Sequence, residues 1–477
     1  MPKTMWILTE ERPKKEVVSQ ILKKFSEEQG VLASFDSLRI IPILDESSNF
    51  ISEYKILGVK SPTIENIYLS IISGSSSFVD YLVYFQDSKP DPKERPLYAI
   101  EETKTDDSES RNTGVFQRAT KFVYLEVFHP GVDKTMLYNL QIDQKDKPTE
   151  TNIFGTRCFR TLGVQFMGKK DNTASLSGWS SIHELIEFKA QMKKAHSGNV
   201  PIVIKQVSNE LISISGKLYK KGPKKKDGTY SGGLTNDPNI GALSLIAATL
   251  RNLGWTKRIQ IVKHGLTEEM VRPKNKFVQI ANHLNIELDG INLPGAYLPG
   301  KYWEYETTGE KLGSIFIHLV VEEFSEGFSI YENHAGCERG YFYTADRKPL
   351  AVGKRLSNKD GVMLKNAEKI AIPDLVIFDS KRSEMINIEG ERSVNVDAGI
   401  KQIANFSNME KTYIKHYYPK CKVIRTVVLY GGDGKSIEND EVGFLLNSSG
   451  KMVLGKNAPK VFEEAIQNLI KFWQLAS

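Results

Sequence analysis

The sequence predicts a mixed α/β fold with α+β character, and three observations support this prediction. Runs rich in β-branched and aromatic residues alternate with stretches whose apolar residues recur at helical spacing. The two ends of the chain share one order of elements: an Asp-bearing strand, a strand that ends in acidic residues, a helix and a further strand. The composition, with 40% hydrophobic and 26% charged residues, is that of an ordinary globular protein.

The length of 477 residues allows about two to four domains. The repeated order at the two ends predicts three consecutive regions. These are an N-terminal core over residues 1–145, a middle region over 146–360 and a C-terminal core over 361–477.

In the N-terminal core, a helix is predicted over residues 15–29, because apolar residues recur at helical spacing until Gly30 ends the pattern. The other elements follow from β-rich runs, helical spacing and turn residues. They are strands at 38–44 and 54–59, a short helix at 63–72, strands at 80–85 and 97–104, a helix at 115–128 and a strand near 136–140.

The middle region combines helices with β-rich segments. Residues 217–226 contain six lysines together with Gly222 and Pro223, so this basic run is predicted to be a loop. Residues 290–356 are rich in aromatic residues, glycine and β-branched residues, which predicts a largely β layer. The other expected elements are a helix at 182–195, strands at 201–206 and 211–218, a helix at 241–253 and a strand at 259–262.

The C-terminal core returns to the alternation of strands and helices seen at the start of the chain. Its first two predicted strands are expected to lie side by side. The predicted elements are strands at 372–378 and 385–391, helices at 397–406 and 408–416, a strand at 423–430 and a terminal helix at 459–474.

Charge and cysteine content restrict the functional class. The formal net charge of +6 permits a polyanionic partner without requiring one. Three widely separated cysteines, Cys158, Cys337 and Cys421, do not suggest a disulfide framework. The pair His334 and Cys337 lacks a second pair at zinc-ligand spacing. With no signal-peptide pattern and no apolar stretch near ~20 residues, a cytoplasmic protein without a membrane segment is expected.

The most informative segment contains Asp80, Glu102 and Lys104. Side chains alternate along a strand, so Glu102 and Lys104 are expected on one face, and Asp80 opens the neighbouring strand toward the same point. Asp80 and Glu102 offer the hard oxygen ligands that Mg²⁺ prefers. Lys104 would orient or help to deprotonate a metal-bound water. The alternative without catalysis is a surface strand whose Glu and Lys side chains pair across one face.

This arrangement resembles the PD-(D/E)xK nuclease superfamily, best known from type II restriction endonucleases. Asp80, Glu102 and Lys104 match the motif acids and lysine, although Val79 stands where the motif has proline. The resemblance implies a restriction-endonuclease-like core, with a central mixed sheet flanked by helices, and Mg²⁺ as cofactor. It also implies hydrolysis of phosphodiester bonds in double-stranded DNA.

A second constellation occurs in the C-terminal core, where Pro373 and Asp374 precede Glu389 and Glu391. It resembles the same motif with the Pro-Asp pair intact. Asp374 and Glu389 would be the metal ligands, and Glu391 occupies the lysine position. The chain is therefore expected to contain two such cores with two unequal active sites; the alternatives are a structural relic or a metal-binding core without catalysis.

The functional prediction is a site-specific, Mg²⁺-dependent DNA endonuclease of the type II restriction class, accompanied by a cognate DNA methyltransferase. The middle region is the candidate for base recognition. The alternatives are a low-specificity repair or defence nuclease, and a DNA-binding or regulatory protein with decayed nuclease cores. The candidate DNA-binding residues are Arg111, Asn112, Gln117, Lys121, Lys220, Lys221, Lys224 and Lys225.

Overall fold

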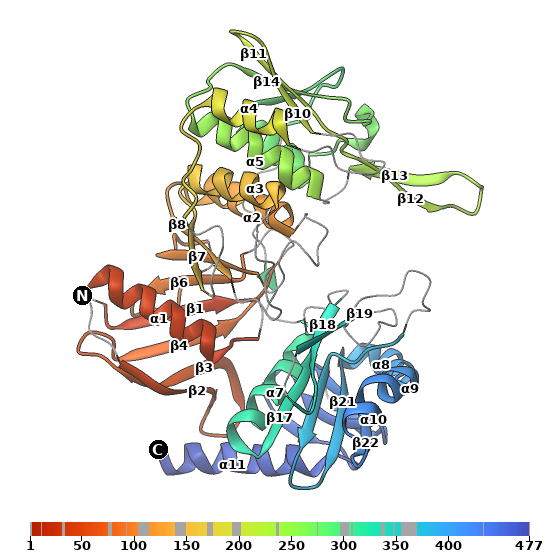
Figure 1. Ribbon diagram of the computed structural model, residues 1–477. Coiled ribbons are helices and arrows are strands. Elements are labelled where there is room, and N and C mark those ends of the chain that lie inside the picture. Colours follow the sequence, from red (N-terminus) through yellow and green to blue (C-terminus); the bar gives the residue numbers. More distant parts are fainter. Residues whose placement is uncertain are drawn as a thin grey trace. The chain divides into compact units, whose positions relative to one another are not determined.

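The computed structural model is a mixed α/β protein with several mixed sheets (Figure 1). It divides into two compact units, each described separately below. Unit 1 comprises Met1–Ser73, Phe85–Pro90 and Tyr305–Ser477, and unit 2 comprises Gly74–Tyr84 and Asp91–Glu304. The described residues are 2–10, 12–30, 34–74, 79–91, 93–103, 114–138, 149–168, 175–192, 202–234, 238–273, 275–295, 305–306, 309–334, 339–346, 349–353, 370–432 and 434–476.

This division differs from the three consecutive regions predicted from the sequence. Unit 1 joins the first strands of the chain to its C-terminal part, because side chains from the two segments pack against each other. The rings of Phe50 and Phe316 lie 4.9 Å apart. The indole of Trp473 donates a hydrogen bond to the carbonyl oxygen of Pro42 at 2.8 Å. Contacts between residues so distant in sequence are not visible in local patterns.

The N-terminal part of unit 1 contains one helix and four adjacent strands. Helix α1 (Lys15–Gln29) matches the predicted range, and Gly30 ends it with a φ of 63°. The strands lie in the order β2-β3-β4-β1. The helix expected at 63–72 is instead strand β4, which pairs in parallel with β1, because tertiary pairing outweighs weak local preference. The strands are β1 (Thr4–Thr9), β2 (Ser34–Leu44), β3 (Phe50–Lys60) and β4 (Asn66–Ile71).

The C-terminal part of unit 1 is an eight-stranded mixed sheet in the order β19-β18-β17-β20-β21-β22-β23-β24. Strands β20 and β21 are adjacent, as the sequence predicted; they pair antiparallel, and β21 and β22 are parallel. The strands are β17 (Gly327–Glu332), β18 (Arg339–Tyr343), β19 (Pro349–Gly353), β20 (Leu375–Asp379), β21 (Glu384–Arg392), β22 (Lys422–Tyr430), β23 (Val442–Leu446) and β24 (Met452–Leu454).

Helices cover both faces of this sheet. Helix α7 (Lys311–Phe324) packs on one face, where Ser314 approaches Gly390 of β21. Helix α8 (Val396–Ile403) packs on the other face, where Gly399 approaches Glu391. Helix α7 lies in the segment predicted to be a β layer. Its residues from Gly313 to Val321 are all buried, and Ser314 and His318 are the polar ones among them. The run therefore lacks an exposed polar face, and periodicity did not identify it as a helix.

The other helical elements of unit 1 complete these layers. Met409, Tyr413 and Ile414 pack with Val376 and Met385 in a buried cluster on the α8 side of the sheet. Helix α11 (Lys460–Ala476) packs against α7. The remaining short elements are η3 (Ser393–Asn395), α9 (Ser407–Met409), η4 (Glu410–Ile414, a π-helix), α10 (Lys415–Tyr417), η5 (Lys435–Glu438), β5 (Ser73–Gly74) and β16 (Tyr305–Glu306).

Unit 2 contains a mixed sheet segment, a second sheet and a helical layer. Strands β6 (Tyr81–Phe85), β7 (Tyr98–Thr103), β8 (Asp133–Tyr138) and β9 (Gln165–Gly168) lie side by side in that order. The pair β6–β7 is antiparallel, and β7, β8 and β9 are parallel. The second sheet has the order β10-β11-β14-β15, with strands β10 (Val203–Ser208), β11 (Leu211–Ser215), β14 (Arg258–Val262) and β15 (Ile286–Leu288).

The helical layer of unit 2 is centred on α5 (Pro238–Asn252), which packs against α2 (Gly114–Phe128) and α3 (Glu150–Thr161). Gly241 permits the close approach of α5 to α2, because a Cβ there would overlap the carbonyl oxygen of Phe116. The other helices are α4 (Ile182–Gln191), η1 (Glu268–Met270) and α6 (Lys276–His283). Among the described residues, no helix is long and apolar enough to cross a membrane.

Candidate functional site: two acidic hairpins

The β6–β7 hairpin, with Asp80 at its entrance, is the first acidic hairpin. Asp80 directly precedes β6, and its Oδ2 accepts a hydrogen bond from the backbone N–H of Glu102 at 2.6 Å. Asp80 is buried, with 4% of its surface exposed. Because the carboxylate is held by backbone of the partner strand, its position is fixed by the pairing of the hairpin itself.

Glu101 and Lys121 complete a buried cluster around Asp80. Helix α2, which follows β7, places the Lys121 Nζ 2.9 Å from Oε2 of Glu101 and 3.4 Å from Oδ1 of Asp80. Arg118, three residues earlier on the same helix face, lies 3.8 Å from Oε1 of Glu101. Two carboxylates and a lysine therefore meet at one point. We call Asp80, Glu101 and Lys121 the first acidic cluster.

The structure places Glu101, and not the predicted Glu102, on the same face as Asp80. Tyr81 pairs with Ile100 across the hairpin, so Asp80 lies opposite Glu101. Side chains alternate along β7, and Glu102 leaves the opposite face, where its Oε2 accepts a hydrogen bond from the hydroxyl of Tyr81 at 3.2 Å. The sequence pattern favoured Glu102 only because a lysine stands two residues after it. The hairpin register, which decides the face, was not available from the sequence.

Electrostatics distinguish Glu101 from an ordinary surface acid. Burial and, second, the nearby charge of Asp80 raise the pKa of Glu101 to about 8, although Lys121 and Arg118 act in the opposite direction. Near neutral pH the two carboxylates therefore either share a proton or need a cation to balance their negative charge. A divalent metal ion would provide that balance.

We expect this carboxylate to make the metal-free protein less stable as the pH rises. The pKa of Glu101 is about 8 in the folded protein against an ordinary value of 4.5. The folded state thus binds the proton more tightly, and the stability gained from it is complete below about pH 4.5 and is lost by about pH 8. Urea unfolding of chelator-treated protein at several pH values measures this loss. In Glu101→Gln the same interval should show a smaller decline; an equal decline would contradict the prediction.

The β20–β21 hairpin, with Asp374 at its entrance, is the second acidic hairpin and repeats this geometry. Leu375 pairs with Ile388, so Asp374 lies opposite Glu389 in the register that places Asp80 opposite Glu101. Oδ2 of Asp374 accepts the backbone N–H of Gly390 at 2.9 Å, as Asp80 does from Glu102. In both hairpins a helix follows, and the next strand is parallel to the acidic one.

The acids of the second hairpin differ in burial. Glu389 is buried, with 5% of its surface exposed. Burial and, second, the charge of Glu310 raise the pKa of Glu391 above its ordinary value. Matching the two hairpins by register aligns Glu389 with Glu101 and Glu391 with Thr103. The second acidic hairpin therefore carries all three residues predicted from the sequence, Asp374, Glu389 and Glu391. The side chains of the two glutamates lie on the α8 side of the sheet.

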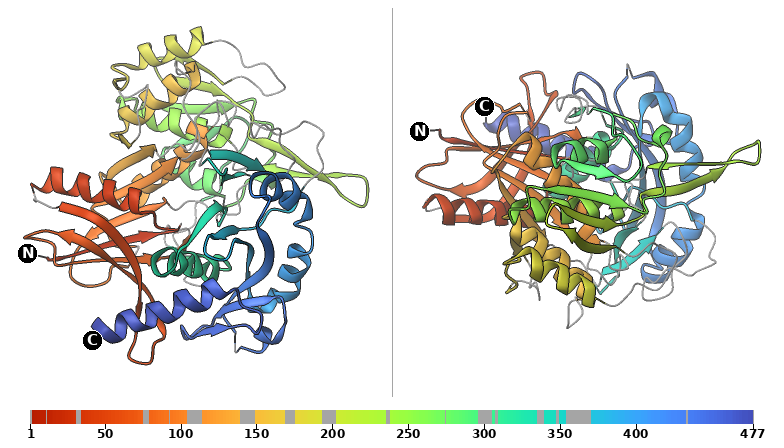
Figure 2. Two further views of the ribbon diagram at one scale, coloured as in Figure 1. Left: turned by 60° about the horizontal axis from the view of Figure 1, so that its bottom comes forward. Right: turned by 90° about the horizontal axis from the view of Figure 1, so that it is seen from above.

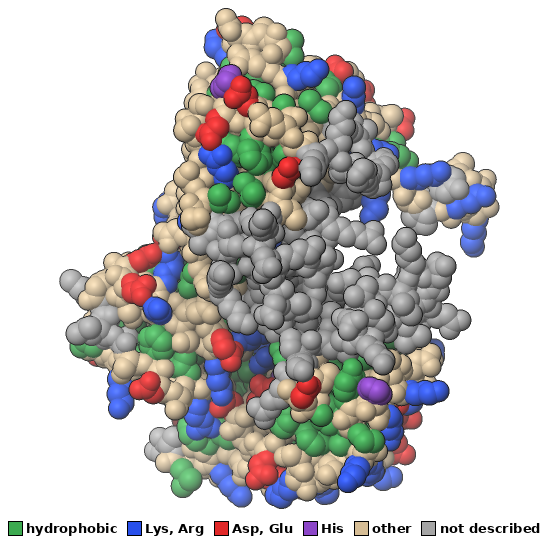
Figure 3. All heavy atoms as spheres, in the orientation of Figure 1, with side chains coloured by type: hydrophobic (Ala, Val, Ile, Leu, Met, Phe, Trp, Pro, Cys, Tyr) green, Lys and Arg blue, Asp and Glu red, His purple; other side chains and the backbone are tan. Residues whose placement is uncertain are grey.

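The basic run predicted to be a loop is instead a β-hairpin. Strands β12 (Tyr219–Lys224) and β13 (Tyr230–Leu234) pair antiparallel, with Lys220 opposite Gly233 and Lys221 opposite Gly232. We call this element the basic hairpin; it projects from unit 2 in both views of Figure 2. Basic side chains gather along it in Figure 3. The exposed lysines of the hairpin are Lys220, Lys221, Lys224, Lys225 and Lys226.

The other residues predicted to bind DNA have different outcomes. Lys121 belongs to the first acidic cluster, and only 17% of its side chain is exposed. Gln117 lies in α2, but its side chain is outside the described part of the structure. Lys104, Arg111 and Asn112 also lie outside the described residues, so their roles stay predictions.

Comparison with known proteins identifies no relative. No protein-family model matches the chain, and no curated protein and no solved structure matches it.

Proposed function

We propose that the protein is a magnesium-dependent, site-specific endonuclease that hydrolyses phosphodiester bonds of double-stranded DNA, in the manner of a type II restriction enzyme. The observation that carries this proposal is the first acidic cluster, in which two buried carboxylates of adjacent strands meet one lysine. The repetition of its Asp and Glu positions in the second acidic hairpin supports a restriction-endonuclease-like core at both places.

The residues of the first acidic cluster suit a magnesium ion. Asp80 and Glu101 would hold the ion, because carboxylate oxygens are its preferred protein ligands. Burial and, second, the charge of Asp80 disfavour the ionised form of Glu101, as its raised pKa shows, so a bound cation would stabilise that form. When bound, magnesium would lower the pKa of a coordinated water and withdraw electron density from the phosphodiester.

The chain's own groups would orient the reactants. The backbone N–H of Glu102 fixes the carboxylate of Asp80 at 2.6 Å, which restrains one ligand before any ion arrives. The ammonium of Lys121 contacts both Glu101 and Asp80, so it would lie close to a phosphate held by a metal ion on these two carboxylates. There it would offer positive charge to the oxygens that become more negative during in-line attack.

The second acidic hairpin would form a second, unequal site. Asp374 and Glu389 correspond to Asp80 and Glu101, and Glu391 corresponds by register to Thr103. One chain with two different sites would cut the two DNA strands by separate centres, which suits an asymmetric recognition sequence. A methyltransferase that modifies this sequence would protect the host DNA, and we place both proteins in the cytoplasm.

The basic hairpin would supply contacts to DNA phosphates. Replacing Lys220, Lys221, Lys224 and Lys225 by Gln should weaken binding to all DNA sequences alike. The slope of log K against log salt is negative, and each lost phosphate contact makes it less steep by about 0.9. Four lost contacts would therefore reduce its magnitude by about 3.6. Titrations at several salt concentrations measure this slope. Gln substitutions at four exposed lysines elsewhere, Lys420, Lys451, Lys456 and Lys471, serve as the matched control.

An unchanged slope in the hairpin variant, or an equal decrease in the control, would remove the basic hairpin from the DNA-binding surface. The nuclease proposal is tested separately, by incubating the full chain with long unmethylated DNA and Mg²⁺. Discrete fragments that disappear with chelator are expected. A smear would show a low-specificity nuclease, and DNA binding without cleavage under any divalent cation would show a binding protein with decayed cores.

A further inference from the structure

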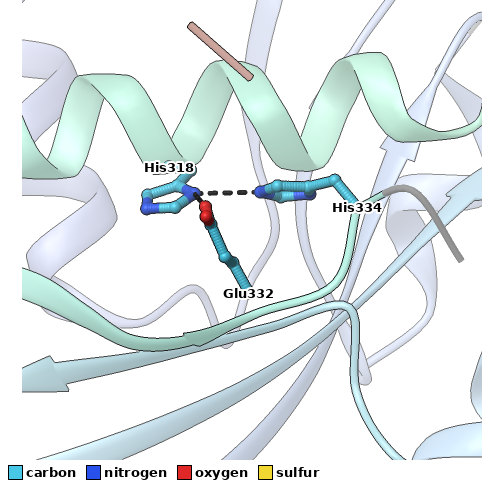
Figure 4. A group of neighbouring side chains, drawn as sticks. All are labelled: His318, Glu332 and His334. Atoms are coloured by element: carbon cyan, nitrogen blue, oxygen red, sulfur yellow. Dashed lines mark hydrogen bonds and ion pairs between the residues drawn. The ribbon is translucent and has the colours of Figure 1, made fainter. Parts of the chain in front are cut away.

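A cluster of two histidines and a glutamate lies in unit 1, outside the acidic groups of both hairpins. His318 is fully buried on α7, and Glu332 and His334 stand at the end of β17. Their side chains point toward one another (Figure 4). One potential ligand atom from each lies within 4.8 Å of the others, and Nδ1 of His318 is 2.9 Å from Nε2 of His334.

The outer nitrogens of both rings have acceptors. Nε2 of His318 lies 3.0 Å from Oε1 of Glu322. The other oxygen of Glu322 lies 3.3 Å from the guanidinium of Arg12, so this carboxylate acts as an acceptor. Nδ1 of His334 lies 3.1 Å from Oγ of Ser314. The hydroxyl of Ser314 donates its hydrogen to the carbonyl of Lys311, so its oxygen accepts from His334.

These bonds assign the hydrogens of both neutral rings to the outer nitrogens. Nδ1 of His318 and Nε2 of His334 then each present a lone pair toward the other at 2.9 Å. Two lone pairs at that distance repel each other unless a cation lies with them. The cation is either a proton shared by the rings or a metal ion that the two nitrogens ligate after a small separation.

We propose that His318, His334 and Glu332 form a transition-metal site for a borderline cation such as Zn²⁺. Imidazole nitrogens with one carboxylate are a usual zinc donor set, and three protein ligands leave a fourth position for water. His334 and Glu332 are partly exposed, which gives the ion and the water access. Mg²⁺ prefers oxygen ligands, so this site is chemically distinct from the first acidic cluster.

The surroundings have the form of an outer ligand shell. Glu322 and Ser314 orient the two rings through their outer nitrogens. The guanidinium of Arg12 donates to Oε2 of Glu332 at 2.6 Å, which fixes the third ligand. Such outer partners orient ligands in known metal sites. Arg12 contacts Glu332 and Glu322, and Lys14 also contacts Glu332 at 3.4 Å. Two cations and two carboxylates leave no excess negative charge, so affinity would depend on coordination to imidazole.

The site lies beside the second acidic hairpin. Asn333 stands between two of the ligands, and its backbone N–H donates to the carbonyl of Asp374 at 2.6 Å. A metal ion would thus tie the end of β17 to α7 next to Asp374. This proposal does not depend on nuclease activity, and its test measures binding alone.

The test is zinc binding to the full chain after removal of metals by a chelator. Titration with zinc chloride in excess Mg²⁺, which occupies carboxylate sites, should give one zinc per chain. His334→Ala and Glu332→Gln should each weaken this binding at least about 100-fold, because each removes a ligand. His183→Ala, which removes an exposed histidine of α4, should bind as the unchanged protein does.

X-ray absorption at the zinc edge of the unaltered protein provides a readout that needs no variant. Scattering from two imidazole rings with oxygen neighbours is expected. The proposal is overturned by absence of zinc binding, by sulfur ligation, or by a His334→Ala protein that remains folded and binds zinc as tightly as before. If the two rings share a proton and bind no metal ion, the titration would show no zinc binding.

Discussion

Replacing Glu101 by Gln is expected to abolish cleavage by the first site, whereas Glu102→Gln is expected to leave cleavage close to the unchanged level. Glu101 shares Lys121 with Asp80, and its loss removes a proposed metal ligand. Because loss of an outer partner of a ligand already costs about 10–100-fold, loss of the ligand should cost at least about 100-fold. Glu102→Gln keeps an oxygen that accepts from Tyr81.

The measurement is the rate of Mg²⁺-dependent cleavage of a plasmid with each strand followed separately. Thermal unfolding of both variants serves as the control for folding. The two substitutions remove the same charge from neighbouring residues of one strand, so they differ mainly in the face affected. Loss of activity in Glu102→Gln with normal activity in Glu101→Gln would contradict the register-based assignment and return the role to Glu102 and Lys104.

If the protein is the nuclease proposed above, replacing Asp374 by Asn should leave a protein that nicks a single strand. Asp374 is the counterpart of Asp80, because each precedes the first strand of its hairpin and accepts a backbone N–H of the second strand. If each hairpin serves one DNA strand, the first site still cuts while the second fails. Plasmid should then accumulate as open circles, with linear product reduced at least about 100-fold.

The reciprocal variant provides the control for this second prediction. Asp80→Asn should also produce open circles, but with the nick on the other strand, and the double variant should produce none. Sequencing of the nicked ends identifies the strand. Complete loss of both cuts in either single variant would exclude two independent sites. Unchanged linear product in Asp374→Asn would show that the second acidic hairpin has no catalytic role.

The sequence located the acidic hairpins correctly but not the contacts within the first one. The strands around Asp80 and the antiparallel pair after Asp374 were predicted within a few residues of their bounds. Glu101 was missed, because the pattern that identifies a lysine two residues after an acid selects Glu102. Glu101 could have been identified from the pairing of Tyr81 with Ile100, but this pairing is part of the strand register, which the sequence does not reveal.

Two further features were beyond the reach of local patterns for a related reason. Helix α7 is buried through most of its length, so it shows no alternation of polar and apolar faces. His318 lies within this apolar run, and only packing of α7 against β17 brings it within 2.9 Å of His334. The two histidines are 16 residues apart and form no known metal-ligand motif. The pair of His334 and Cys337 was not assigned as a zinc site, because it lacks a second pair of ligands.

The sequence by itself determined the mixed α/β class, most of the helices, fewer than half of the strands, and the positions of both acidic hairpins. These features follow from side-chain periodicity and turn residues, which act over a few neighbours in the chain. The tertiary structure decided which acid faces Asp80, which lysine joins it and which histidines meet. It also decided that the two chain ends share one unit. Those outcomes depend on strand register and on packing between distant segments, since a shift of one residue reverses the face of every side chain.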